Sequence, residues 1–262
     1  MKKQILFILS AFFMITCNIR EMNEKLEVIA HRGGASLGPE NTLDCIRQGI
    51  LAGADAIEID VHLSADGALV VCHDETLDRT TDMHGRIEDL TLSRIKTASI
   101  SHVNGTERIP TLEEVLYEVK GKCRVLLEIK KSREGQYPQI EDKVVALIDT
   151  LGMKDQIVIQ SFNDSVLKKL HAIAPEIPLE KLLVCRLPFG LAYDTALHKF
   201  SLDDYPYVQS FNTFNMFTTD RFIAEAHKIG KQVKVWTVDN PLKVKKGADG
   251  VITNCPQRFR EG

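Results

Sequence analysis

Short runs of apolar, β-branched residues alternate with stretches of helical periodicity along almost the whole chain after about residue 26. This alternation is typical of an α/β protein in which covering helices join the strands of a parallel sheet. We predict eight strands, at residues 28–30, 56–63, 125–129, 157–162, 182–185, 207–211, 233–238 and 250–253. Eight parallel strands in 262 residues predict a single-domain (β/α)₈ barrel, or TIM barrel, whose usual length is about 250 residues.

The stretches between these strands predict helices, because their apolar residues recur three or four positions apart. The expected helices cover residues 42–52, 112–119, 140–151, 165–173 and 221–228. Asn41 stands directly before the first of them and Asn163 two residues before the fourth, where an asparagine side chain can accept a hydrogen bond from a free backbone N–H. We therefore expect both asparagines to be N-caps.

One segment departs from the simple alternation. The apolar run 68–73 follows the second strand after Asp66-Gly67, a dipeptide typical of hairpin turns. We expect a small hairpin or loop insertion here, followed by a long connection over residues 74–110 without a core strand. Long connections after barrel strands commonly carry function, because the active site lies at that end of the barrel.

Acidic side chains gather on the second and third core strands. Glu58 and Asp60 are two residues apart and therefore share one face of a strand, and Glu128 and Lys130 repeat this spacing on the next strand. Either pair alone fits outward ion pairs with the helices. Carboxylates that point into a barrel need a cation, because burying a bare charge is very costly. The three carboxylates provide hard oxygen ligands, which suit Mg²⁺ or Ca²⁺ and not zinc or copper.

Two histidines and two further cations belong to the same predicted mouth. His31 and Arg32 directly follow the first strand, His73 follows the hairpin, and Lys130 ends the third core strand. They supply two candidate proton carriers and two positive charges beside the carboxylates. A divalent cation, fixed positive charges and proton carriers are the equipment for phosphoryl transfer. The residues alone thus indicate a metal-assisted phosphoester hydrolase.

A few other residues have weaker patterns. Trp236, the only tryptophan, lies near the end of the seventh strand, where it fits either a substrate contact or barrel packing. Gln160 is expected at the mouth, and Glu40 is expected to order the first loop through hydrogen bonds. His62 and His84 are near the motifs in number only, and we expect both to be solvent-exposed or loop residues.

The chain resembles the glycerophosphodiester phosphodiesterase family in an ordered series of motifs that covers essentially everything after residue 26. The motifs are Ile29-Ala30-His31-Arg32-Gly33-Gly34, Pro39-Glu40-Asn41-Thr42, Ile57-Glu58-Ile59-Asp60-Val61, Val70-Val71-Cys72-His73-Asp74, Leu77-Asp78-Arg79-Thr80-Thr81, Leu127-Glu128-Ile129-Lys130, Gln160-Ser161-Phe162, Val235-Trp236-Thr237-Val238 and Asp249-Gly250-Val251-Ile252-Thr253. Asn254 follows, where the family often has Asp, and we assign it no catalytic part.

The resemblance implies a barrel enzyme that hydrolyses glycerophosphodiesters, such as glycerophosphocholine and glycerophosphoethanolamine, to an alcohol and sn-glycerol 3-phosphate. It implies one divalent cation, and attack by the substrate's own glycerol hydroxyl to give a cyclic phosphate that water then opens. The implied site consists of metal ligands Glu58, Asp60 and Glu128, acid and base His31 and His73, and substrate contacts Arg32, Lys130 and Trp236.

Three other functions stay open at this stage. A phospholipase D-type relative acting on lysophospholipids would share the layout but would need an apolar acyl-binding loop, and residues 74–110 are largely polar. A phosphoinositide-type phospholipase C is disfavoured by the order of the motifs. A non-catalytic phosphate-ligand binding barrel predicts the loss of a histidine or a carboxylate, and the sequence keeps all of them.

The N-terminal residues resemble an export signal. Lys2 and Lys3 precede an apolar run over residues 5–15, which is too short to span a bilayer. Cys17 stands where bacterial lipoproteins carry their lipid, and it is either lipidated or removed by cleavage nearby. We expect residues 1–22 to be a signal peptide or lipoprotein signal and 23–262 to be the barrel domain. The protein is then exported to the periplasm or anchored by lipid in the cell envelope.

Composition excludes several other partners. The formal net charge is −3, so the chain lacks the excess of Lys and Arg that nucleic acid requires, and we expect a small-molecule substrate with no protein partner implied. The six cysteines include no C-x-x-C pair, which excludes a zinc ribbon or a thioredoxin-like centre. We assign no chemistry to the five cysteines other than Cys17.

Overall fold

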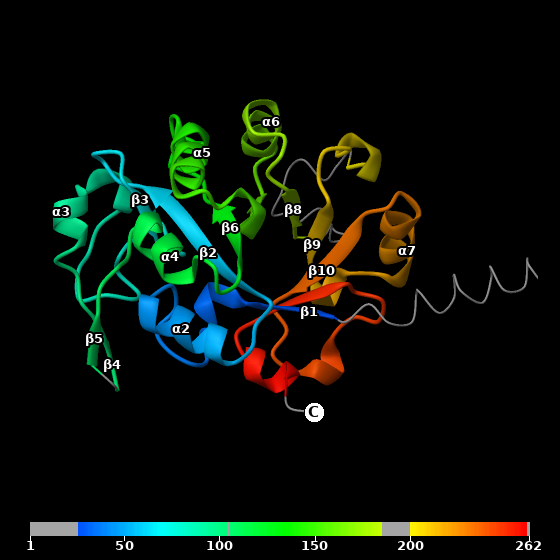
Figure 1. The fold of residues 1–262 in the computed structure, drawn as a ribbon, viewed down its shortest axis with the longest axis horizontal. Coiled ribbons are helices and arrows are strands. Elements are labelled where there is room, and N and C mark those ends of the chain that lie inside the picture. The colour runs from blue at the N-terminus through cyan, green and yellow to red at the C-terminus, as the bar shows by residue number, and fades with distance from the viewer. Residues whose placement is uncertain (1–25, 104, 185–199, 261–262) are drawn as a thin grey trace, which may run out of the picture.

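The computed structural model describes residues 26–103, 105–184 and 200–260 (Figure 1). Eight parallel strands close into a barrel, which confirms the predicted fold. Around the barrel they are β1 (Glu27–Ala30), β2 (Ala56–Leu63), β6 (Arg124–Ile129), β7 (Ile157–Ser161), β8 (Leu179–Leu183), β9 (Ser210–Phe214), β10 (Gln232–Trp236) and β11 (Gly250–Thr253). β1 closes the ring by pairing with both β2 and β11.

Helices cover the outside of the barrel (Figure 1). They are α2 (Leu43–Leu51), α4 (Leu112–Val119), α5 (Ile140–Leu151), α6 (Asp164–Ile173) and α7 (Asp220–Lys228). Asn163 caps α6 as predicted. The cap predicted at Asn41 is wrong, because Thr42 caps α2 by accepting from the Cys45 N–H. Asn41 has a left-handed backbone (φ 58°), and its side-chain amide is directed to Asp60 instead.

Side chains alternate between the inside and the outside of the barrel. The outward residues of β2 and β6, such as Ile57, Ile59 and Leu127, pack with the helices in the main hydrophobic core. The inward residues include a smaller apolar cluster of Ile29, Ala56, Leu126, Val158 and Ile252. Above this cluster, towards the carboxyl ends of the strands, the inward positions are polar. The apolar cluster thus forms the floor of a polar site at the carboxyl ends of the strands.

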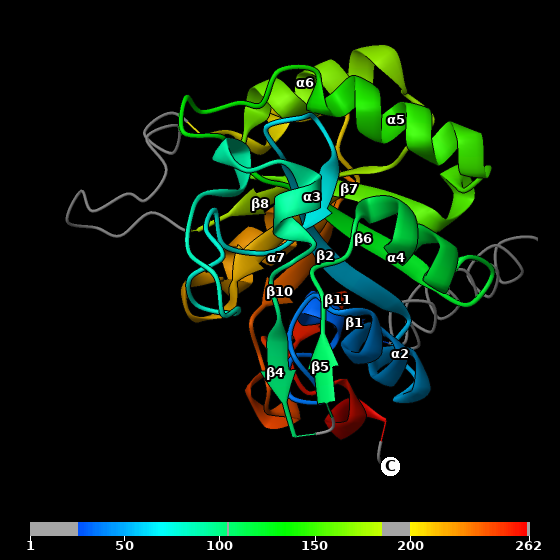
Figure 2. The ribbon, with the colours of Figure 1, turned by 90° about the vertical axis from the view of Figure 1, so that its left-hand side faces the viewer.

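Residues 64–103 and 105–110 lie beside β2 (Figure 2) and carry their own small core. The strand β3 (Leu69–Val71) turns back antiparallel on β2 after Asp66-Gly67. The connection that follows holds the one-turn helix α3 (Leu92–Ile95) and the strand pair β4 (Ile100–His102) and β5 (Gly105–Glu107). Its apolar side chains pack with one another and with β3, as a cluster of Val70, Cys72, Leu77, Ile87, Ile95, Ala98, Ile100 and Ile109.

Two strands lie three residues away from their predicted positions. We predicted a strand at 182–185, but β8 begins at Leu179 and carries the buried polar residues Glu180 and Lys181. We predicted another at 207–211, but β9 runs over Ser210–Phe214 with Asn212 buried inside the barrel. Inside the barrel these two strands carry the buried polar residues Glu180 and Asn212, so the apolar pattern misses part of each element.

The signal predicted at residues 1–22, including Cys17, lies outside the described residues, and so does Cys185. Four described cysteines, Cys45, Cys72, Cys123 and Cys255, are free thiols. Within the described ranges, no helix is long and apolar enough to cross a membrane.

Candidate active site

The predicted site residues meet at the carboxyl end of the barrel. His31 and Arg32 form a tight turn directly after β1, with a left-handed backbone at Arg32 (φ 52°) and at Gly33 (φ 88°). The Arg32 N–H donates to Glu58 Oε2 at 2.8 Å, which fixes this turn to β2. Helix α2 holds the turn from outside, because Gly49 packs directly against the Gly33 carbonyl.

Three buried carboxylates form the centre of the site. Glu58 and Asp60 point inward from β2, and Glu128 points inward from β6, where it is paired in register with Asp60. One ligand oxygen from each lies within 4.8 Å of those of the other two. The side chains are almost inaccessible, at 1%, 1% and 7% exposure. The structure therefore brings together all three predicted metal ligands.

The charges at the centre are strongly perturbed. Burial raises the pKa of Glu58 well above its usual value, and Asp60 and Glu128 beside it act in the same direction. Burial also raises the pKa of Glu128, although Lys130 opposes it. At Asp60 the attraction of Lys130, His73 and Arg32 outweighs burial and lowers its pKa. Three adjacent carboxylates that cannot all ionise easily are a natural site for a hard divalent cation, which would balance their charge.

Two cations border the carboxylates. Lys130 Nζ lies 2.9 Å from Glu128 Oε1 and 3.2 Å from Asp60 Oδ1, and these two carboxylates hold its pKa above the usual value in spite of burial. Arg32 Nη1 donates to Glu40 Oε1 at 2.9 Å, while its Nε lies 3.9 Å from Asp60 Oδ2. Glu40 thus orders the first loop, as predicted.

His31 is held by an amide. Its Nδ1 lies 2.7 Å from Asn254 Oδ1, and the Asn254 amide nitrogen donates to Asp239 Oδ2 at 3.0 Å. Because the nitrogen faces Asp239, the oxygen faces His31, and Nδ1 must carry the hydrogen while Nε2 stays an acceptor. Burial, followed by the charge of Arg32, lowers the pKa of His31 to about 4. This histidine is neutral at pH 7.

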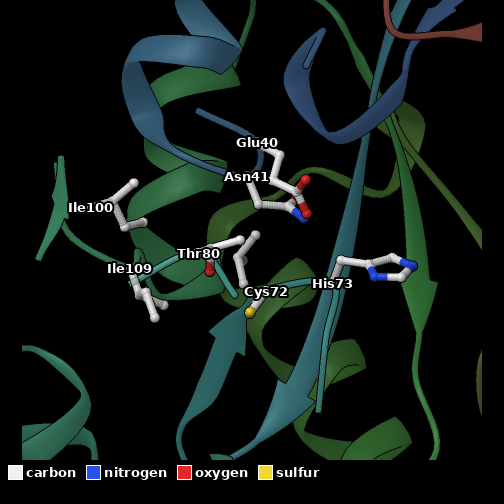
Figure 3. Close-up of a pocket in the computed structure, with 8 residues that line it drawn as sticks. Glu40, Asn41, Cys72, His73, Thr80, Ile100 and Ile109 are labelled. Atoms are coloured by element: carbon white, nitrogen blue, oxygen red, sulfur yellow. The ribbon is translucent and has the colours of Figure 1, made fainter. Parts of the chain in front are cut away.

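His73 is held by a carboxylate. It lies just beyond β3, and its Nδ1 is 2.7 Å from Asp74 Oδ1. The Arg79 side chain lowers the pKa of Asp74 to about 2, so that Asp74 is ionised and accepts the Nδ1 hydrogen. Figure 3 shows a pocket that Glu40 and Asn41 of the first loop line together with Cys72, while the His73 ring points away from Ile100 and Ile109.

Trp236 ends β10 and belongs to an aromatic group at the rim. Its ring makes edge contacts with Phe162, at 6.0 Å between centroids, and with Phe214, at 5.2 Å. Its indole N–H donates to the Asn212 carbonyl, and the ring packs on the apolar cluster inside the barrel. Gln160 is buried and paired in register with Glu128; its Nε2 is 3.4 Å from Glu58 Oε1, and its Oε1 accepts a hydrogen bond from Asn212.

The sequence missed or misjudged several residues around the site. The expectation that His62 is exposed is wrong: it is 2% exposed and bonds to the Tyr137 hydroxyl, and burial lowers its pKa to about 4. His84 is exposed, as expected. Asn254, to which we gave no part, orients His31. Its place directly after β11, at the carboxyl end of a barrel strand, was the signal that could have identified it.

The fold and the site together define a class of protein. A parallel barrel with buried carboxylates, basic side chains and two oriented histidines at its carboxyl mouth has the groups of a phosphoester hydrolase. Residues 31–258 match the glycerophosphoryl diester phosphodiesterase family, and the chain belongs to this family. The predicted resemblance is confirmed.

Named relatives and solved structures agree with this assignment. The chain is 36% identical over 244 residues to a glycerophosphodiester phosphodiesterase of Caldanaerobacter subterraneus, covering 89% of this chain and 96% of the relative. It is 31% identical to the enzyme of the same name from Bacillus altitudinis, covering 88% and 96%. A phosphodiesterase of Oleispira antarctica, solved in complex with the product sn-glycerol-3-phosphate, is similar at 25% identity and TM-score 0.74, covering 89% and 95%.

Proposed function

We propose that this protein hydrolyses glycerophosphodiesters, such as glycerophosphocholine and glycerophosphoethanolamine, to an alcohol and sn-glycerol 3-phosphate, with Mg²⁺ or Ca²⁺ as cofactor. One observation carries the proposal: Glu58, Asp60 and Glu128 converge within 4.8 Å, beside two cations, under two oriented histidines. The names of the relatives and the product bound to the Oleispira antarctica phosphodiesterase support the same reaction.

The charges fit a cation and a phosphodiester together. Three carboxylates with Lys130 and Arg32 leave one negative charge in excess when all are ionised. A divalent cation turns this into an excess of one positive charge, which one phosphodiester anion then neutralises. Glu58, Asp60 and Glu128 would hold the cation, which, when bound, stabilises negative charge on the phosphate oxygens. Arg32 Nε lies 3.9 Å from one oxygen of Asp60 and Lys130 Nζ lies 3.2 Å from the other, and these two cations would bind the remaining phosphate oxygens.

The two histidines divide the proton transfers. The 2-hydroxyl of the substrate's glycerol attacks phosphorus, which forms one O–P bond and breaks the bond to the departing alcohol oxygen. His31, neutral and with Nε2 free, takes the hydroxyl proton. His73, oriented by Asp74, gives a proton to the alkoxide. Burial lowers the pKa of His73, and the hydrogen bond to Asp74 opposes this by favouring the imidazolium form. Water then opens the cyclic phosphate with the roles exchanged. Trp236 at the rim supplies an apolar face for the glycerol carbons.

A second candidate is phospholipase D-type hydrolysis of lysophospholipids. The rim favours it in one respect: the ring of Phe214 contacts both Trp236 and Phe217, and the neighbouring Met216 is 76% exposed. Residues 74–110 oppose it, because their apolar side chains pack into their own cluster. Turnover of lysophosphatidylcholine at a rate equal to that of glycerophosphocholine would favour this second function.

Removal of the cation tests the proposed function. The protein is treated with EDTA, dialysed and assayed on glycerophosphocholine, with Mg²⁺ or Ca²⁺ then added back. We expect activity to vanish and return, and Glu128→Gln to lose it permanently. Glu118→Gln is the matched control, because Glu118 lies on α4 and pairs with Arg47 and Lys122. Full activity in EDTA would contradict the proposal.

Export is the remaining part of the proposed function. The basic start and apolar run of residues 2–15 support a signal, and Cys17 is the candidate for lipid attachment. Mass spectrometry of the mature protein tests this directly. A chain that retains residue 1 in the cytoplasmic fraction would contradict export, and an unmodified or absent Cys17 would contradict lipid attachment.

A further inference from the structure

Arg79 joins two carboxylates that belong to different loops. Its guanidinium donates from Nη1 and Nη2 to the two oxygens of Glu40, at 2.9 and 2.6 Å. It also donates from Nε and Nη2 to the two oxygens of Asp74, at 2.6 and 3.0 Å. The planar fork of an arginine suits this double contact, whereas a lysine offers only a point charge. One side chain thus fixes the first loop to the connection that follows β3.

Each of these carboxylates holds a residue of the active site. Glu40 Oε1 accepts from Arg32 Nη1 at 2.9 Å, and Asp74 Oδ1 lies 2.7 Å from His73 Nδ1. Glu40 therefore connects Arg79 to the proposed phosphate-binding arginine, and Asp74 connects it to a proposed proton carrier. The first loop also carries Asn41, whose amide donates to Asp60 at 2.9 Å.

The energetics of Arg79 favour orientation over stability as its role. Its side chain is 49% exposed, and ion pairs at such exposed positions contribute little to folding. Its partners are more protected, at 17% and 25% exposure for Glu40 and Asp74. The hydrogen bonds of Arg79 are the main cause that lowers the pKa of Asp74, and they also lower that of Glu40 against the effect of burial. Both acceptors therefore stay ionised.

We propose that Arg79 is a positioning residue that aligns Arg32 through Glu40 and His73 through Asp74, without touching the substrate. The inference rests on the proposed function, because it assigns Arg79 to the same site. Without Arg79, Glu40 and Asp74 lose their common anchor, and the two side chains they hold lose a fixed orientation. Residues that orient active-site groups in this way typically change rates by about 10- to 100-fold when removed.

The first test compares two arginines of the same connection. Arg79→Ala should lower kcat/KM by about 10- to 100-fold, and it should weaken inhibition by sn-glycerol 3-phosphate because Arg32 is no longer fixed. Arg86→Ala is the matched control: Arg86 makes a similar double contact with Glu75, at 2.8 and 2.9 Å, and a further one with Glu88. It should leave both quantities unchanged. Equal losses in the two variants would overturn the proposal.

The second test asks whether Arg79 acts only through its two partners. In a Glu40→Gln, Asp74→Asn background, adding Arg79→Ala should cause little further loss, because the route to Arg32 and His73 is already broken. Arg79→Lys in the parent protein should retain part of the activity, because lysine keeps the positive charge but lacks the planar guanidinium that contacts both carboxylates. A further loss as large as in the parent protein would show that Arg79 acts elsewhere and would overturn the proposal.

The third test does not depend on catalysis. Side-chain nitrogen NMR of the folded proteins should show His73 with its hydrogen on Nδ1 in the parent protein and a mixture of tautomers in Arg79→Ala. His31, which is held by Asn254, is the internal control and should not change. An unchanged His73 would overturn the inference about Arg79 even if the enzyme is active. An inactive parent protein with the expected His73 change would contradict the proposed function alone.

Discussion

The replacement of Gly49 by alanine is the sharpest packing test of the site. Gly49 lies in α2, and a Cβ added there would stand 2.2 Å from the Gly33 carbonyl oxygen, whereas real Cβ contacts do not fall below 3.0 Å. The helix or the turn must therefore move by about 0.8 Å, the difference between these two distances. A second contact, 3.0 Å to Ile57, blocks part of the retreat.

The expected effects on stability and on activity differ in size. Alanine gains about 1 kcal/mol in helix propensity, while overpacking costs about 1–3 kcal/mol, so the free energy of unfolding should fall by roughly 0–2 kcal/mol. The displaced turn carries His31 and Arg32, and a misplacement of about 1 Å can lower a rate about 100-fold. Activity should therefore fall far more than stability.

Urea unfolding and the rate of glycerophosphocholine hydrolysis, measured on the same preparations, test this expectation. Leu51→Ala is the control, because Leu51 lies on the same helix with its side chain 79% exposed. The control should keep full activity. A Gly49→Ala protein as active as the parent would refute the view that α2 sets the position of the turn.

Three further predictions concern buried charges. Lys234→Met should lower the free energy of unfolding by about 3–5 kcal/mol in urea titrations, because Lys234 lies 2.6 Å from the buried Glu180, and a small change would contradict this. Burial lowers the pKa of His62 to about 4, below its ordinary 6.5. Between pH 4 and 6.5 the unfolded chain therefore binds more protons than the folded chain, and the free energy of unfolding should fall by roughly 3 kcal/mol as pH drops from 6.5 to 4. His62→Gln should flatten this dependence, and an equally steep curve would exclude His62 as its source. Cation binding should release protons from Glu58 and Glu128, because their pKa values are raised, and the affinity for the cation should therefore fall as pH falls. Calorimetry of cation binding in buffers of different ionisation enthalpy measures this proton release, and a finding of no release would contradict the prediction.

Much of the fold could be predicted where burial produced a simple pattern. β2 is apolar on its outer face, and the prediction of its ends at Ala56 and Leu63 is confirmed. The predicted start of β8 was three residues too late and that of β9 three residues too early. Inside this barrel Glu180 and Asn212 bond to each other, but in the sequence both look like surface residues. A polar interior cannot be distinguished from solvent by periodicity alone.

The site could be predicted in its groups but not in their supports. The two-residue spacing of Glu58 and Asp60 sufficed to bring both carboxylates to one face, as the structure confirms. The partners of the histidines come from distant parts of the chain, since His31 and Asn254 are 223 residues apart. Only the closure of β1 on β11 brings them together. His62 was misjudged for a related reason, because its partner Tyr137 is 75 residues away.

The most direct test of this account is the identity of the products from glycerophosphocholine, followed by ³¹P NMR for the phosphate esters and ¹H NMR for choline and glycerol, with the purified protein and a divalent cation. We expect sn-glycerol 3-phosphate and choline in equal amounts from the parent protein, and no product from His31→Ala or His73→Ala variants that remain folded. Release of phosphocholine and glycerol, or full activity in either histidine variant, would contradict the proposed reaction.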